Sequence, residues 1–473
     1  MDRSHRISRG AGALSRWSLR LSALAAVLAV SACTATTPKS SGTQPTPSAT
    51  ATATATPVPT PTPDVTPAPT PTAAPTAAPT ATPVAKPTAT AGKTSTPAGV
   101  VWKKLRWTAY AAPIKPLPTG ANEDSRFALF GWSGGYVGFR GDWKTDADEN
   151  ILSASIVSAT STDGIHWHDG KSLTLPTLDI QVFKVVEGPS HGLLALGMAH
   201  DQDMCGGPMP VTALWQSNDG GGSWSAVDIH AAFGTDTVPE VEAGGAGYLA
   251  VGTDPKGVPV DLVSTDGFHW TRHPLTASVF KNAVVESQAA FAGGFVLAGS
   301  TSGGCADATT VSTIWWSQTG LSWQKVSLGT FKTSTDGGTY VYKINDQALI
   351  AVHTEMGLSG QADTEKAWTT RDGKTWTSCT LPSVADGVFR GNQVMSDGKR
   401  GLVLSWGSTT ANGKPAPIWA FEPDLSLVSL TQSGDLPTGD DVYFSQAGVA
   451  LGPAGIVLAN TDASRFWVGV PTP

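Results

Sequence analysis

The sequence predicts an all-β protein: a seven-bladed β-propeller whose N-terminal strand closes the last blade, preceded by a signal peptide and a disordered Pro/Thr/Ala linker. Three observations predict this fold. A short turn motif recurs five times, an apolar strand recurs seven times, and the first and last strands of the repeat region each lack a sequence neighbour to pair with. A repeat of roughly 50 residues is typical of architectures that place one small sheet repeatedly around an axis.

The first 33 residues predict export from the cytoplasm. Five arginines lie among the first 20 residues, a short apolar run follows, and Cys33 comes directly after two small residues. This is the layout of a secretory signal peptide, and the apolar run is too short to span a membrane. We therefore expect a signal peptide over residues 1–32.

The segment Val30-Ser31-Ala32-Cys33 resembles the lipobox of bacterial lipoproteins. The resemblance implies that cleavage precedes Cys33, that Cys33 is lipidated, and that the chain is extracytoplasmic and anchored to the cell membrane. Several acyl chains anchor firmly because each buried methylene contributes about 0.8 kcal/mol. The alternative is an ordinary secretory signal that has a cysteine at its cleavage site by chance.

Residues 33–100 predict a lipid-anchored, disordered linker. They consist mainly of Thr, Pro, Ala and Ser, and 15 of the 34 prolines lie here. Such a composition cannot bury enough apolar surface to offset the entropy lost on ordering. In polyproline II form the linker would reach about 200 Å at most, which suits a stalk that carries residues 101–473 away from the membrane.

Charge and cysteine content narrow the function classes. Residues 1–33 carry five Arg and one Asp, so their removal changes the net charge from −7 to −11. An acidic surface repels phosphate backbones, which argues against a nucleic-acid partner. The spacing of Cys205, Cys305 and Cys379 fits no zinc motif, and we expect no metal and no cofactor. A Cys205–Cys305 disulfide and free thiols both remain open.

The repeated turn motif is Ser-x-Asp-Gly-x-x-Trp. Its five copies carry Asp163, Asp219, Asp266, Thr319 and Asp372 at the third position and end at Trp167, Trp224, Trp270, Trp323 and Trp376. The Asp carboxylate and the Ser/Thr hydroxyl can accept backbone N–H bonds within a tight hairpin, and glycine supplies the backbone angle that other residues resist. The tryptophan then packs the outgoing strand. We expect these residues to be structural.

The motif resembles the Asp-box, or BNR repeat, of sialidase-like β-propellers. Successive tryptophans are 57, 46, 53 and 53 residues apart, which makes the resemblance more specific than a single copy would be. The resemblance implies one hairpin for each blade between strands 3 and 4. It also implies that a binding or catalytic face lies at the opposite end of the propeller.

The apolar strand sets the number of blades at seven. Its copies begin at Tyr136, Leu193, Tyr248, Phe295, Ala348, Leu402 and Ile456. Near-continuous apolar runs of this length are typical of buried strands, here the second strand of each blade. A degenerate hairpin at Trp419–Leu427 takes the sixth turn position. Six-bladed closure, as in sialidases, is the alternative, but it leaves one apolar strand unplaced.

Ring closure follows from the two ends of the repeat region. The strand at 465–470 lacks a following partner, and the strand at 102–110, which contains Trp107, lacks a preceding one. Pairing them makes the N-terminal strand the outer strand of the seventh blade. Such closure also removes exposed sheet edges.

The loops between strands 2 and 3 hold the candidate ligand residues, because this face lies opposite the repeated turns. Exposed aromatic rings beside carboxylates are typical of carbohydrate sites. The candidates are Asp142, Trp143, Asp146, Asp148, Glu149, His200, Asp254, Glu355, Trp406 and Asp462.

Two functions follow from these features. A lipid anchor, a stalk and a rigid propeller favour a binding or scaffold protein that recognises a glycan or an extracellular protein. The alternative is a glycoside hydrolase that uses carboxylates of the strand 2–3 loop face. The sialidase resemblance would imply three arginines that grip a carboxylate and a Tyr/Glu pair. The chain has eight arginines after residue 100 and no Arg-Ile-Pro motif near the first strand. The sequence therefore favours binding, and no catalytic residue is assigned.

Overall fold

The computed structural model describes residues 102–111, 123–146, 151–178, 180–199, 211–301, 309–332, 337–355, 364–382, 392–405, 417–437, 448–460 and 465–472. The expected signal peptide and linker, including the lipidation residue Cys33, lie outside these residues, as do Cys205 and Cys305. Within them, no helix is long and apolar enough to cross a membrane.

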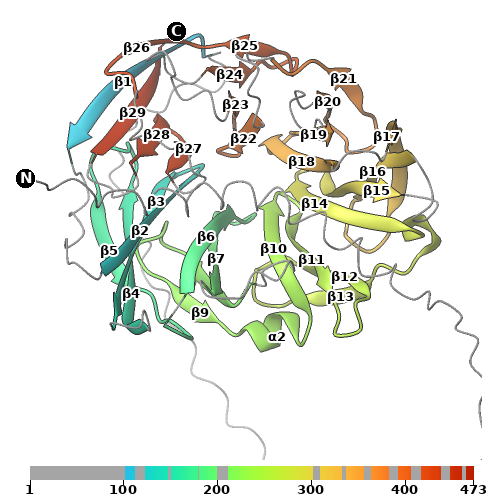
Figure 1. Ribbon diagram of the computed structural model, residues 1–473, viewed down its shortest axis with the longest axis horizontal. Coiled ribbons are helices and arrows are strands. Elements are labelled where there is room, and N and C mark those ends of the chain that lie inside the picture. Colours follow the sequence, from blue (N-terminus) through green and yellow to red (C-terminus); the bar gives the residue numbers. More distant parts are fainter. Residues whose placement is uncertain are drawn as a thin grey trace, which may run out of the picture. The chain divides into compact units, whose positions relative to one another are not determined.

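The described strands form seven sheets arranged in a ring (Figure 1). Blade 1 contains β2 (Glu123–Trp132), β3 (Gly135–Thr145), β4 (Ile151–Ser161) and β5 (His168–Ser172). Blade 2 contains β6 (Ile180–Glu187), β7 (Leu193–Ala199), β8 (Ala213–Ser217) and β9 (Ser225–Val227). Blade 3 contains β10 (Thr237–Gly244), β11 (Gly247–Thr253), β12 (Pro259–Ser264) and β13 (Thr271–Pro274). Blade 4 contains β14 (Ala283–Phe291), β15 (Gly294–Thr301), β16 (Thr309–Ser317) and β17 (Gln324–Lys332).

The remaining blades continue the same order. Blade 5 contains β18 (Gly337–Asn345), β19 (Ala348–Glu355), β20 (Thr364–Thr370) and β21 (Thr377–Cys379). Blade 6 contains β22 (Asn392–Ser396), β23 (Gly401–Ser405), β24 (Ile418–Phe421) and β25 (Leu427–Ser429). Blade 7 contains β27 (Val449–Gly452), β28 (Gly455–Ala459), β29 (Arg465–Thr472), β1 (Lys104–Ala111) and β26 (Thr431–Gly434). Two short helices, α2 (Ile229–Phe233) and η2 (Ser278–Phe280), lie in connections between blades.

The second strand of every blade is the buried apolar run that the sequence predicts. In β7, the residues from Leu193 to Leu196 have no exposed surface, and β15 and β19 are buried in the same way. Apolar side chains project from both faces of these strands, so each blade packs against both of its neighbours. The number of blades and the all-β fold class are therefore confirmed.

The repeated turns have the hydrogen bonds that their residues predict. In the first turn, Asp163 Oδ1 accepts the backbone N–H groups of Ile165 and His166 at 2.8 Å each, and Gly164 has a φ of 76°. Desolvation opposes ionisation of Asp163, but hydrogen bonds from His166 and nearby groups outweigh it and lower the pKa of Asp163 to about 2. Asp219, Asp266 and Asp372 accept the corresponding bonds in their own turns. These carboxylates hold turns together.

The two ends of the propeller close the ring through antiparallel pairing of β1 with β29. The pairing runs from Lys104 opposite Thr472 to Ala111 opposite Arg465. Closure by the N-terminal strand is therefore confirmed. The sequence did not indicate that β26 pairs in parallel with the outer edge of β1, which gives blade 7 a fifth strand. The Trp107 Nε1 group donates to Gln432 Oε1 at 2.9 Å across this pairing.

Removal of the Trp107 side chain should destabilise the closed ring. Trp107 is 1% exposed and packs in the cluster shared by blades 6 and 7, so Trp107→Ala should lower the free energy of unfolding by about 3–5 kcal/mol. Val470→Ala on β29, where the side chain is 43% exposed, is the matched control and should change it by less than about 0.5 kcal/mol. Denaturant titration of the full chain measures both values, and equal stability of the two variants would contradict the closure.

Candidate functional site

The first strands of blades 2 to 5, which lie innermost around the centre of the ring in Figure 1, carry a group of charged residues. We call this group the axial cluster. It consists of Lys184 on β6, Glu240 and Glu242 on β10, Glu286 on β14 and Lys343 on β18. Charged side chains are uncommon on buried inner strands unless they are paired with an opposite charge or hydrogen-bonded.

Lys184 lies at the centre of the axial cluster. Its Nζ atom forms ion pairs with the carboxylates of both Glu240 and Glu242 on the neighbouring blade. Glu240 and Glu242 are two residues apart on one strand, so their side chains project to the same face and can meet one lysine. The side chains of Lys184, Glu240 and Glu242 are 23%, 40% and 22% exposed, so each keeps some contact with solvent.

The ion pairs change the proton affinities in the cluster. Desolvation works to lower the pKa of Lys184, but the charges of Glu240 and Glu242 outweigh it and raise that pKa above its ordinary value. Burial raises the pKa of Glu242, and the charge of Lys184 opposes this shift. Lys184 is therefore held as a cation between two carboxylates.

Lys343 links the cluster across blade 4. Its Nζ atom donates to the backbone carbonyl of Ala243 at 3.1 Å and lies 3.5 Å from Asp346 Oδ1. The charge of Lys343 also works to lower the pKa of Glu242. Blades 3 and 5 therefore meet through this lysine at the axis.

Glu286 differs from the other members of the axial cluster because it lies in a β-bulge. The register of β14 against β15 shifts between Val285 and Ser287, so Glu286 is the extra residue of a β-bulge. Bulges redirect side chains, and here the carboxylate accepts the backbone N–H of Thr339 and the Ser300 hydroxyl at 3.3 Å. Burial raises the pKa of Glu286 to about 7, even though both hydrogen bonds oppose the shift. At neutral pH this carboxyl group is partly protonated.

Two tyrosines on β18 lie beside the cluster. Burial raises the pKa of Tyr340, with a further contribution from the charge of Glu286, and burial likewise raises the pKa of Tyr342. Both phenols therefore stay protonated at neutral pH and serve as hydrogen-bonding groups, and neither is activated as a nucleophile.

The axial cluster and the two adjacent tyrosines thus combine ammonium donors, carboxylate acceptors and neutral phenols on neighbouring strands. Such a set can hydrogen-bond hydroxyl, amide or charged groups of a ligand without rearranging. In the part of the chain that the structure describes, no three His, Cys, Asp or Glu side chains gather in a way that could hold a metal ion.

The structure places the candidates of blade 1 on a strand. β3 extends to Thr145, so Asp142 and Trp143 belong to it and to no loop. Trp143 is 6% exposed, and its Nε1 group donates to the Leu178 carbonyl at 3.1 Å. The expectation of an exposed aromatic ring at Trp143 is wrong, because the ring packs in the core. Asp142 lies 3.6 Å from Arg140 Nε.

Asp254 and Glu355 lie at the strand 2–3 ends of blades 3 and 5, with blade 4 between them. Asp254 Oδ1 accepts the backbone N–H groups of Lys256 and Val258 at 2.8 Å each, so it shapes a turn. Glu355 ends β19 and lies 4.0 Å from His353 Nε2. Asp146 is half-buried at the end of a described segment. Asp148, Glu149, His200, Trp406 and Asp462 lie outside the described residues.

Sequence reasoning missed the axial cluster. The sequence did contain a signal for it, namely charged residues within otherwise apolar strands. Glu240 and Glu242 alternate with apolar residues, and one lysine lies within the apolar run Ile180–Glu187. The sequence predicts functional residues in the strand 2–3 loops, whereas these residues lie on the innermost strands.

No protein-family model matches the chain, and no curated protein matches it in sequence. Solved structures do resemble it. YCF48 bound to D1 peptide has 12% identity and a TM-score of 0.39, with 79% of this chain and 98% of that chain covered. A lectin of Aleuria aurantia in complex with Fucα1-6GlcNAc has 11% identity and a TM-score of 0.35, with 65% and 96% covered. The family 117 glycoside hydrolase Zg3597 of Zobellia galactanivorans has 10% identity and a TM-score of 0.27, with 56% and 90% covered. Likeness at this level carries no argument about function.

The buried carboxyl group of Glu286 should make stability depend on pH. Its pKa in the folded chain, about 7, lies above the value of 4.5 for an unperturbed glutamate. Between these values the unfolded chain releases the proton first, so stability falls as pH rises from 4.5 to 7, by up to about 3 kcal/mol. Glu286→Gln, which keeps an acceptor for Thr339, should remove this component of the pH dependence.

Denaturant titrations at pH 5 and pH 8 test this expectation. Glu422→Gln in the β24–β25 turn is the control and should keep the wild-type difference between the two pH values. The same difference in Glu286→Gln as in the wild type would show that this carboxyl group does not titrate as described.

Proposed function

We propose that this chain is a binding protein that recognises a glycan or a protein partner through the axial cluster and the adjoining strand 2–3 face. The observation that carries the proposal is the double ion pair of Lys184 with Glu240 and Glu242. It places partly exposed donors and acceptors in fixed positions at the propeller axis. Preorganised polar groups bind a polar ligand with little loss of conformational entropy on binding.

Binding fits the chemistry of the cluster better than hydrolysis does. A general base needs a carboxylate that is free to accept a proton, whereas Glu240 and Glu242 share an ammonium group. The phenol groups of Tyr340 and Tyr342 are held in their protonated form. The cluster is thus arranged to hold a ligand.

One observation favours glycoside hydrolysis as a second candidate. The pKa of Glu286 is raised to about 7, which is the condition for a general acid that works at neutral pH. A glycosidase pairs such an acid with a second carboxylate a few ångströms away. The second carboxylate would have to come from the strand 2–3 face, because Glu240 and Glu242 are both engaged with Lys184.

Binding and hydrolysis can be separated with the full chain on glycan and peptide arrays and with a panel of glycosidase substrates. The proposal predicts retention of a glycan or peptide ligand without turnover, and at least tenfold weaker binding by Lys184→Gln and Glu240→Gln. Glu422→Gln in the β24–β25 turn is the control and should bind like the wild type. Turnover of a substrate by the wild type that is lost in Glu286→Gln would show that the chain is a hydrolase. Ligand binding by Lys184→Gln and Glu240→Gln that equals wild-type binding would refute the axial site.

We also propose that the propeller is displayed outside the cytoplasm by a lipid on Cys33, as the lipobox resemblance implies. In a bacterium that processes lipoproteins, labelled fatty acid should enter the wild-type chain, and the chain should sediment with membranes. Cys33→Ala should abolish the label and release the protein from that fraction. Fatty-acid labelling that persists in Cys33→Ala would contradict the anchor.

A further inference from the structure

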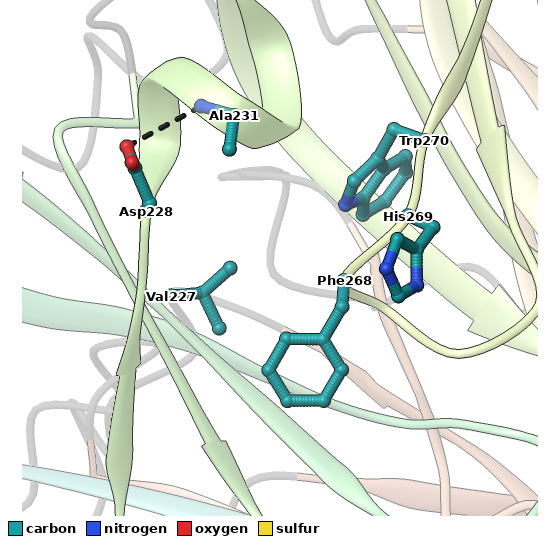
Figure 2. A pocket seen from close by; sticks show the side chains of 6 residues that line it. All are labelled: Val227, Asp228, Ala231, Phe268, His269 and Trp270. Atoms are coloured by element: carbon teal, nitrogen blue, oxygen red, sulfur yellow. Dashed lines mark hydrogen bonds between the residues drawn. The ribbon is translucent and has the colours of Figure 1, made fainter. Parts of the chain in front are cut away.

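An open hollow lies between the end of blade 2 and the third repeated turn, residues 264–270. We call it the turn 3 hollow. One side of it comes from the end of β9 and the α2 region, and the other side comes from the turn (Figure 2). Its volume of about 360 Å³ is within the range typical of small-ligand pockets. The lining residues are Val227, Asp228, Ala231, Phe268, His269 and Trp270.

The third turn differs from the other four repeated turns in the two residues before its tryptophan. Only this turn combines an aromatic residue, Phe268, with a histidine, His269. Phe268 is 40% exposed, and among the described residues it is the only aromatic side chain in the group of exposed large hydrophobic residues. Part of its ring is therefore open to a ligand in the hollow.

Hydrogen bonds hold the turn side of the hollow in place. Asp266 Oδ1 accepts the backbone N–H groups of Phe268 and His269 at 2.8 Å each, and Asp266 Oδ2 lies 2.7 Å from His269 Nδ1. Trp270 Nε1 donates to the Gly267 carbonyl at 3.1 Å. Side chains fixed in this way need little rearrangement when a ligand binds.

The lining offers two acceptors that have no partner within the described residues. Asp228 Oδ1 accepts the backbone N–H groups of His230 and Ala231, whereas Asp228 Oδ2 has no such bond. Asp228 is exposed, so a ligand can reach this carboxylate from solvent. In neutral His269 the Nδ1 proton faces Asp266, so Nε2 is an acceptor, and the His269 side chain is 90% exposed.

The charges around the hollow favour a cation. Its lining includes no lysine and no arginine. Desolvation works to raise the pKa of Asp266, but hydrogen bonds from His269 and neighbouring N–H groups outweigh it and lower that pKa below its ordinary value. A ligand therefore meets two carboxylates, an imidazole acceptor and an aromatic ring. A guanidinium group matches this set, because it is planar, carries a positive charge, and has N–H donors but no acceptor.

We propose that the turn 3 hollow binds an arginine side chain of a protein partner. The guanidinium group stacks on the ring of Phe268 and donates to Asp228 Oδ2, and the carboxylates of Asp228 and Asp266 balance its charge. The net charge of −7 favours the approach of a basic partner, and the open hollow admits a side chain that projects from its surface. This site is independent of the proposed axial function, because it shares no residue with the axial cluster.

Isothermal titration calorimetry of the full chain at pH 8 and low ionic strength tests the site. The probe is the peptide acetyl-Gly-Gly-Arg-Gly-Gly-amide, and two matched peptides carry lysine or citrulline in place of arginine. The arginine peptide should bind, the lysine peptide at least threefold more weakly, and the uncharged citrulline peptide at least tenfold more weakly. Equal binding of the arginine and citrulline peptides would overturn the proposal.

Variants of the hollow locate the binding. Asp228→Asn removes the charge but keeps an oxygen that caps α2, and it should weaken binding of the arginine peptide at least tenfold. Phe268→Ala should weaken it at least threefold. Leu321→Ala at the same position of the fourth turn, where the side chain is 62% exposed, is the matched control and should bind like the wild type. Equal binding by Phe268→Ala and Leu321→Ala would contradict the stacking on Phe268.

Further measurements separate this site from the axial cluster and from other ligands. Loss of arginine-peptide binding in Glu240→Gln but not in Asp228→Asn would place the peptide at the axis and overturn the proposal. Tighter binding of free L-arginine than of the capped peptide would overturn the assignment to a protein partner. Binding of methyl β-D-galactoside or methyl β-D-glucoside that is lost in Phe268→Ala, without binding of the arginine peptide, would assign the hollow to a glycan and also overturn it. Near-ultraviolet circular dichroism checks that each variant is folded, and the exposed position of Phe268 keeps its comparison valid if Asp228→Asn is not.

Discussion

The antiparallel pairing of β1 with β29 is the constraint on which the rest of the propeller depends. It joins residues more than 350 positions apart, from Lys104 with Thr472 to Ala111 with Arg465. Blade 7 then packs on blade 1, where Tyr136 donates its hydroxyl to the Gly455 carbonyl at 2.8 Å. Among the described residues, an apolar cluster fills each of the seven contacts between neighbouring blades, and β26 covers the outer edge of β1.

Ring closure also determines what lies at the axis. The innermost strand of each blade has one edge without a neighbouring strand. Side chains of neighbouring blades form hydrogen bonds with some of the backbone N–H and C=O groups on this edge. Glu286 accepts the Thr339 N–H, and Gln288 donates to the Glu240 carbonyl at 2.9 Å. Polar residues are therefore needed at the axis for structural reasons. The same residues give the ring a charged interior that a ligand can use, so structure and proposed function share one set of side chains.

The sequence predicts the propeller fold well and the candidate sites poorly, for physical reasons. The number of blades and the closing strand follow from local patterns and from counting strands without partners. β26 lacks an apolar pattern and pairs through its backbone, so nothing in Thr431–Gly434 marks it. The direction of the Glu286 side chain depends on a bulge that the sequence does not reveal. Trp143 shows that an aromatic residue near a strand end can belong to the core.

Native-state hydrogen exchange tests the central claim of closure most directly. If β1 is integral to the ring, its backbone amides should exchange only through global unfolding, with the same opening free energy as the buried strands β7 and β15. Exchange of β1 amides through local fraying, with opening free energies near zero while β7 and β15 stay protected, would show that the ring does not depend on this pairing.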